Sequence, residues 1–310
     1  MKRAWLLALP GLFLAAALAA ALAFFSRPPA LVVTDIPFAE LYGQRRIRAG
    51  QARASAALFR RVRPVMIADD ASPDMLIAAI RAASERPAVV MFPRRFAAAA
   101  ERFHREFPET PVALFRGNVP ASQLPSGGGL FAVFGTDGAT DLFRAGLMAG
   151  IAGSAARGGE GGAGSRGMTH VLWQGRFVGP RGRELFAAAA AEADPGSSAA
   201  FVSSAAHMPD MAAVSSMVLA GAGADFLERS RGAPVILFSW MDPALAPDAV
   251  VAIFDDSPWA LAVQAARLSA RGEFSAEIPS RALIFSGRAA DNGVARALRR
   301  AARALPQEAN

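Results

Sequence analysis

Acidic, aromatic and arginine side chains follow the short apolar runs of this 310-residue chain. In open α/β sheets, ligands bind outside the carboxyl ends of the strands, so side chains at these positions are the candidate ligand contacts. The candidates are Asp35, Phe38, Asp69, Phe92, Arg116, Phe177, Trp240, Asp242, Asp256 and Trp259. Arginines and aromatic rings suit stacking, cation–π contacts and hydrogen bonding, so this set favours binding over catalysis.

Motifs typical of enzymes and metal sites are missing from the sequence. His104, His170 and His207 lie far apart, and neither an HExxH nor a GxSxG pattern occurs. The cysteine count of zero excludes disulfides, zinc–cysteine sites and a thiol nucleophile. Glycines 159–167 match the dinucleotide fingerprint only formally, because the predicted order there is helix, turn, strand rather than strand, turn, helix. We therefore expect no enzyme, no metal and no cofactor, and we expect His170 to be structural.

Two pairs of adjacent acids also stand near strand ends, Asp69-Asp70 and Asp255-Asp256. Adjacent residues of an extended segment point to opposite faces, so neither pair forms a catalytic dyad by itself. An alternative to ligand binding is N-capping of the following helix, which suits Asp70 and Asp256.

Composition excludes disorder, because 53% of the residues are hydrophobic and can form a sizeable core. The net charge is +7, and Lys2 is the only lysine among the 33 basic residues. Together with abundant alanine, this bias indicates the codon usage of a GC-rich genome, so we expect no nucleic-acid partner.

The N-terminal residues 1–30 resemble a secretory signal or an uncleaved membrane anchor. Lys2-Arg3 precedes residues 4–25, which carry no charge. Ala21-Leu22-Ala23 offers a cleavage pattern, whereas 22 apolar residues are enough to span a bilayer. Both alternatives stay open, and the leading positive charges predict that the rest of the chain lies outside the cytoplasm.

From residue 31 onward, apolar runs alternate with helical patterns, which indicates βαβ units and mainly parallel sheets. We expect a helix capped by Ser72 with Pro73 in its first turn, and a helical stretch around 209–229. The expected strands are 31–35, 65–69, 88–92, 112–115, 130–134, 169–173, 200–204, 234–239, 249–254 and 281–286. Ten strands are too many for one ordinary domain, so we predict two α/β lobes with a boundary near 118–140.

The order of several segments resembles the basic membrane protein family of periplasmic binding proteins. The segments are FGTDGATDLFRAGLMAGIAG (134–153), THVLWQG (169–175), ILFSWMD (236–242), AVVAIFDDSPWALAVQAARLSARGEF (249–274) and LIFSGRAADNG (283–293). Two features depart from the family: Asp35-Ile36-Pro37-Phe38-Ala39-Glu40 replaces its acidic, Ser-Phe-Asn-containing motif, and the lipoprotein cysteine is absent.

The resemblance implies the type I periplasmic binding fold, with two Rossmann-like lobes and a ligand between them. It assigns 31–135 plus 250–274 to one lobe and 136–249 plus 275–310 to the other. It also implies capture of a small polar or aromatic solute, with nucleosides as one option, for the permease of an ABC importer. By its match to the family's strand-end aspartate, Asp242 would bind ligand hydroxyls. The alternative is a degenerate binding fold that serves as a sensor or structural envelope protein without transport.

Overall fold

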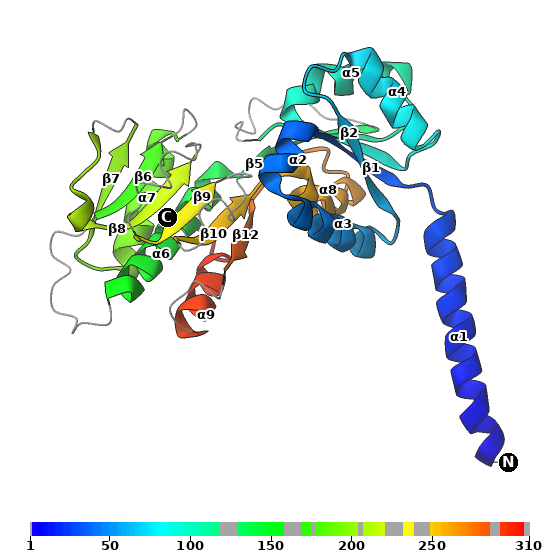
Figure 1. Ribbon diagram of the computed structural model, residues 1–310, viewed down its shortest axis with the longest axis horizontal. Helices are drawn as coiled ribbons and strands as arrows, with labels where there is room; N and C mark the ends of the chain where they lie inside the picture. The colour runs from blue at the N-terminus through cyan, green and yellow to red at the C-terminus, as the bar shows by residue number, and fades with distance from the viewer. Residues whose placement is uncertain are drawn as a thin grey trace.

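The protein contains two six-stranded sheets, each flanked by helices (Figure 1). The computed structural model describes residues 2–117, 129–157, 169–174, 178–203, 207–220, 232–238, 249–285 and 292–306. All strand pairs within the two sheets are parallel, except the antiparallel pair of β10 with β12. The predicted α/β class with two mainly parallel sheets is confirmed.

The first sheet has the order β11-β5-β4-β3-β1-β2. Its strands are β1 (Ala30–Asp35), β2 (Val62–Ile67), β3 (Val89–Pro93), β4 (Val112–Phe115), β5 (Phe131–Thr136) and β11 (Ser275–Ile278). Strand β1 is buried on both faces: Ala30 and Val32 pack into one core, and Leu31 and Val33 into the other. This alternation is the two-residue period of a central strand.

Helices cover both faces of the first sheet. One core includes residues of α2 (Ile36–Tyr42), α3 (Gln44–Leu58) and α8 (Pro258–Ala270). The other includes residues of α4 (Pro73–Ala83) and α5 (Ala97–Glu106), with the short helix η1 (Arg94–Phe96) before α5. The predicted cap of α4 is confirmed, since the Ser72 side chain accepts a hydrogen bond from the Met75 amide and Pro73 opens the helix. The alternative that Asp70 caps this helix is wrong, because Ser72 occupies the N-cap position.

The second sheet has the order β12-β10-β9-β8-β6-β7. Its strands are β6 (Thr169–Gln174), β7 (Ser198–Val202), β8 (Val214–Ala220), β9 (Val235–Phe238), β10 (Val250–Asp255) and β12 (Arg281–Ile284). One face packs against α6 (Gly138–Arg157), α7 (Pro180–Ala193) and α9 (Asn292–Ala301). Within the described residues, the expected helix at 209–229 is wrong: a 3-10 turn, η4 (Met211–Ala213), leads into the buried strand β8. The core contacts of Val214, Met217 and Leu219 favour the strand.

The described chain passes between the sheets three times, after β5, after β10 and after β11. Strand β10 belongs to the second sheet and β11 to the first. The expected lobe ranges, with 250–274 in the first lobe and 275–310 in the second, therefore do not match the sheets to which these two strands belong. Of residues 250–274, α8 packs with the first lobe against α3 and β3, and Phe274 packs into the same core. The crossovers after β5 and β11 are hydrogen-bonded to each other: the Asp137 amide donates to Ile278 O at 3.1 Å, and the Ser280 amide donates to the Asp141 carboxyl at 2.9 and 3.1 Å.

Helix α1 (Lys2–Ser26) precedes the first lobe and extends away from it (Figure 1). Large apolar side chains along it are exposed, among them Phe13 at 73% and Leu22 at 64%. In the described part of the chain, no helix combines the length and the apolar character that crossing a membrane requires.

Candidate ligand-binding site

Charged side chains gather at the carboxyl edge of the first sheet. Asp35 ends β1, Asp69 follows β2, Arg95 follows β3 and Arg116 follows β4. Because β3, β1 and β2 are neighbours in the sheet, the first three of these residues meet. This edge is where ligands bind in open α/β sheets.

Arg95 joins the two predicted acids. Its Nη1 lies 3.0 Å from Asp35 Oδ1, and its Nη2 contacts Asp69 Oδ1. Nη2 also donates to the Asp69 backbone oxygen at 3.2 Å. The Asp35 side chain is 3% exposed, whereas those of Arg95 and Asp69 are 41% and 61% exposed. Asp35 is therefore fixed inside the protein, and Arg95 and Asp69 face solvent.

Asp35 also shapes the backbone that carries Phe38. Its Oδ1 accepts a hydrogen bond from the Phe38 amide at 2.7 Å, which caps the N-terminus of α2. The Phe38 ring stacks on Tyr42, with centroids 5.0 Å apart and planes at 21°. The half-buried Phe38 thus has one ring face committed to Tyr42.

A buried network connects α2 and α3 with the end of β10. Tyr42 donates to Asp255 Oδ2 at 2.5 Å, and Ser257 Oγ donates to Asp255 Oδ1 at 2.7 Å. Arg46 Nη2 lies 3.4 Å from Asp255 Oδ2, and its guanidinium stands 4.1 Å from the Tyr42 ring centroid. Burial raises the pKa of Tyr42 above its ordinary value. The charge of Asp255 and the hydrogen bond to its carboxylate raise this pKa further. Tyr42 is therefore a stable proton donor to the Asp255 carboxylate.

The network lies beside the predicted residue Asp256 but was not predicted from the sequence. Burial, followed by the adjacent charge of Asp255, raises the pKa of Asp256 to about 7. Ser257, and not Asp256, occupies the N-cap position of α8, so the capping alternative for Asp256 is wrong. One signal pointed to Tyr42: it is the single tyrosine of the chain.

The other candidates fall into three groups. Phe92 and Trp259 are 0% and 2% exposed and pack in the two cores of the first lobe. Arg116 is partly buried just past β4, and its Nε has no hydrogen-bond partner among the described residues. Phe177, Trp240 and Asp242 lie outside the described residues. The structure thus brings Asp35 and Asp69 together and places Phe92 and Trp259 where side chains pack.

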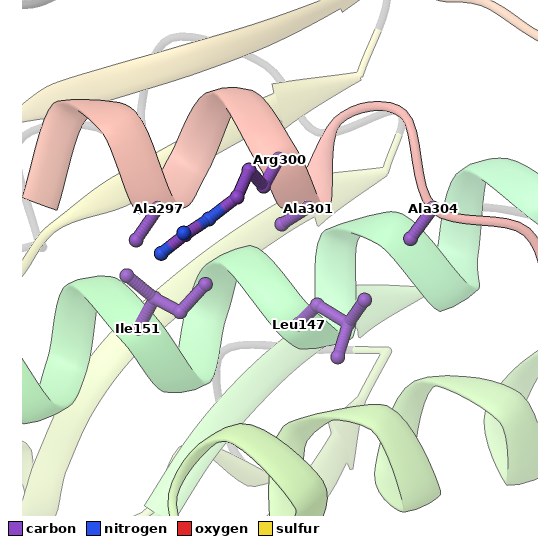
Figure 2. Close-up of a pocket in the computed structure, with 6 residues that line it drawn as sticks. All are labelled: Leu147, Ile151, Ala297, Arg300, Ala301 and Ala304. Carbon is purple, nitrogen blue, oxygen red and sulfur yellow. The ribbon is translucent and has the colours of Figure 1, made fainter.

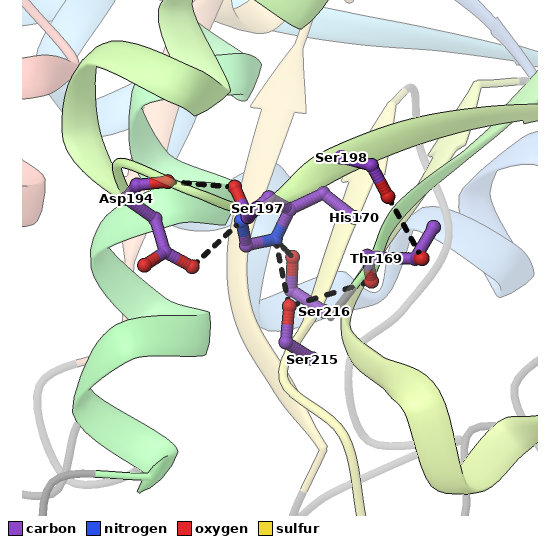
Figure 3. Close-up of polar contacts among 7 residues, drawn as sticks. All are labelled: Thr169, His170, Asp194, Ser197, Ser198, Ser215 and Ser216. Carbon is purple, nitrogen blue, oxygen red and sulfur yellow. Dashed lines mark hydrogen bonds and ion pairs between the residues drawn. The ribbon is translucent and has the colours of Figure 1, made fainter. Parts of the chain in front are cut away.

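His170 forms a second polar cluster, at the start of β6 in the second sheet (Figure 3). Its Nε2 lies 3.0 Å from Asp194 Oδ2, and its Nδ1 lies 2.8 Å from Ser216 Oγ and 3.0 Å from Ser215 Oγ. Serine, histidine and aspartate are the residue types of a hydrolase triad. Here all four side chains are buried, so the cluster joins β6, β8 and the end of α7 rather than meeting a substrate.

An open groove lies on the second lobe, between α6 and α9 (Figure 2). It has a volume of about 260 Å³ and is lined by Leu147, Ile151, Ala297, Arg300, Ala301 and Ala304. The groove is formed by helices and not by strand ends. Among the described residues, no group of three or more acidic or histidine side chains is arranged to hold a metal ion.

Comparison with known proteins gives the fold. Neither a protein-family model nor a curated protein sequence matches the chain. A transcriptional activator of the comK gene from Bacillus halodurans is similar in structure, with 15% identity, a TM-score of 0.56, and coverage of 88% of this chain and 95% of that one. A solute-binding protein of an ABC transporter system from Conexibacter woesei is similar too, with 14% identity, a TM-score of 0.55, and coverage of 89% and 94%. Neither is described as an enzyme. The two lobes therefore have the fold of type I periplasmic binding proteins, and membership of the basic membrane protein family is not confirmed.

Proposed function

We propose that the chain is a solute-binding protein that acts outside the cytoplasm. It would hold a small polar or aromatic ligand between its lobes and deliver it to an ABC-transporter permease. The observation that carries this proposal is the cluster of Asp35, Asp69 and Arg95 at the carboxyl edge of the first sheet. Carboxylates accept hydrogen bonds from hydroxyl groups and a guanidinium donates them, so the cluster suits a hydroxyl-rich ligand such as a sugar.

Exposure indicates which of these groups would contact the ligand. Arg95 and Asp69 are 41% and 61% exposed, so their side chains can turn towards a solute. Asp35 would hold Arg95 in place, since it is buried and caps α2. Among the residues outside the described ranges, Trp240 and Asp242 remain proposed contacts, for stacking and for hydrogen bonds to ligand hydroxyls. Nucleosides remain one option for the ligand.

Native mass spectrometry of the protein purified from its own host tests the proposal directly. We expect a co-purified small molecule, and a thermal-shift screen with sugars and nucleosides should then identify its class. A ligand at 100 times its Kd stabilises the folded protein by about 2.7 kcal/mol. If neither a bound molecule nor a shift with any solute is found, solute binding is refuted.

A pair of arginine variants tests the site itself. Arg95 and Arg102 are alike in exposure, at 41% and 39%, and each pairs with two carboxylates. Only Arg95 lies at the strand ends, because Arg102 is on α5. Arg95→Ala should weaken ligand affinity roughly 10- to 100-fold, since charged hydrogen bonds are lost, and Arg102→Ala should leave affinity unchanged. Equal affinities of the two variants would place the ligand elsewhere.

A sensor or structural protein without transport is the second candidate. It is favoured by the internal pairing of Asp35 and Asp69 with Arg95 and by the packing of Phe92 and Trp259, which leave fewer groups for a ligand. A permease and an ATPase encoded beside the gene would support transport, and their absence would favour this candidate.

We also propose that residues 4–25 direct export of the chain. The uncharged sequence after Lys2-Arg3 supports this. Intact-mass measurement of the protein from its host distinguishes cleavage near Ala23 from retention of the segment. Recovery of the protein only from the cytoplasm would refute export.

A further inference from the structure

The end of helix α1 packs on the end of helix α3. The Phe24 and Phe59 rings lie 5.9 Å apart, and the Arg27 guanidinium stands 4.9 Å from the Phe59 ring centroid. Arg27 Nη1 also donates to the Phe59 backbone oxygen at 3.3 Å. Phe59 has a left-handed φ of 46°, which ends α3 and turns the chain towards β2. The apolar helix therefore meets the first lobe at a defined junction.

Four arginines lie close to this junction along the backbone: Arg27, Arg60, Arg61 and Arg63, called the junction arginines below. The Ala30 amide donates to Arg61 O at 2.9 Å, and Arg63 pairs with Leu31 in the β1–β2 register, so these residues lie beside the start of β1. Arg27 and Arg63 are exposed, and Arg60 and Arg61 are partly exposed.

The charge of the junction arginines is not balanced by nearby acids. Residues 41–68 contain seven arginines and neither an aspartate nor a glutamate. Within the described ranges, no carboxylate pairs with a junction arginine, in contrast to Arg46, Arg95 and Arg102. Since like charges repel, such a cluster gains free energy from an anionic partner.

The surface next to this charge is apolar. Phe13, Leu14, Leu18, Leu22 and Phe25 of α1 are 61–73% exposed. A nucleic acid, or a peptide of acidic residues alone, would match the arginines but leave these side chains in water. A lipid surface matches both, because its acyl region takes up apolar side chains and its anionic headgroups lie just outside that region.

We propose that the junction arginines bind the anionic headgroups of a phospholipid bilayer while the side chains of α1 contact its apolar region. The contact would fix the orientation of the first lobe relative to the bilayer, because Phe59 contacts both Phe24 of α1 and Arg27. It does not depend on the identity or the existence of a transported solute.

Vesicle flotation of the full chain tests the proposal, with phosphatidylcholine alone and with phosphatidylcholine mixed with phosphatidylglycerol. Each arginine near an anionic surface contributes roughly a fivefold gain in affinity, so Arg60→Gln, Arg61→Gln and Arg63→Gln together should lower affinity for the anionic vesicles roughly 100-fold. Binding to phosphatidylcholine alone should not change. The matched control is Arg296→Gln, Arg299→Gln and Arg303→Gln, which removes the same charge from exposed positions in and just after α9.

The control variant should keep the preference for anionic vesicles. An equal loss in both triple variants would show that net charge alone decides, and would overturn the proposal. Wild-type protein tests it independently of whether the variants fold, since its preference must disappear when salt is raised to about 0.5 M. Absence of any preference in the wild type, or binding to a DNA duplex in place of anionic vesicles, would also refute the lipid assignment.

Discussion

Replacement of Gly146 by alanine should destabilise the second lobe, because α6 and α7 approach each other at glycines. A Cβ atom on Gly146 would lie 2.4 Å from the Phe186 carbonyl oxygen and 2.9 Å from Ala189 Cβ. One turn later, a Cβ on Gly150 would lie 2.7 Å from Ala193 Cβ. The obstructing atom at Gly146 is backbone, so the helices themselves must move apart.

The magnitude follows from two opposing effects. Overpacking a close contact costs about 1–3 kcal/mol, and alanine is favoured over glycine in a helix interior by about 1 kcal/mol. Because the obstructing atom is backbone, the upper part of the overpacking range applies, about 2–3 kcal/mol, so we expect Gly146→Ala to lower the free energy of unfolding by about 1–2 kcal/mol. For a lobe of this size, that change lowers Tm by about 2–8 °C, which differential scanning calorimetry resolves.

Gly179→Ala is the matched control. Gly179 precedes α7 at a φ of −74°, and a Cβ there would meet no atom within 4 Å. As an N-cap residue it should lose less than about 1 kcal/mol on replacement by alanine. If Gly146→Ala melts at or above the wild-type temperature, the close approach of α6 and α7 is refuted.

Two further predictions concern buried polar groups near the crossovers. Tyr42→Phe removes the donor to Asp255 Oδ2 and should cost about 1.5–3 kcal/mol, measured by urea denaturation; an unchanged midpoint would show that Arg46 and Ser257 suffice. Burial raises the pKa of Asp141 to about 8, from 3.8 in its unperturbed state. The folded state therefore binds this proton more tightly than the unfolded state. The contribution of this proton to the free energy of unfolding is fully present below about pH 4. It is lost as the pH rises to about 8, with a slope of at most about 1.4 kcal/mol per pH unit. Asp141→Asn keeps an acceptor for the Ser280 amide and should flatten stability over this range, whereas an unchanged slope would contradict the assignment.

The alternation of strands and helices could be predicted because each signal is local. Ser72 and Pro73 mark the start of α4, and Pro180 likewise opens α7. Strand β1 could be recognised from its β-branched run after two prolines.

Two strands lacked such a local signal. Ser215 and Ser216 interrupt the apolar run of β8, and their side chains bond to His170 inside the protein. Strand β11, with the sequence SAEI, has no apolar run, and its pairing with β5 fixes its conformation. Tertiary contacts therefore determine the strand conformation of both segments.

The candidate site was predictable only in part, for the same reason. Strand ends pointed to Asp35 and Asp69, but nothing local indicated that Arg95 would join them. Tyr42 and Asp255 are 213 residues apart in the chain, so their hydrogen bond depends on the crossover after β10.

This hydrogen bond also restricts how the two lobes can be arranged. Asp255 is the last residue of a strand in the second sheet, whereas Tyr42 and Arg46 belong to helices of the first lobe. Any rotation of the lobes that moves the end of β10 away from α2 must break the contacts of a fully buried carboxylate. An unpaired buried charge is costly, so rotation is favoured only about axes that keep Asp255 in place. The crossover after β10 is therefore held in place by buried contacts with the first lobe.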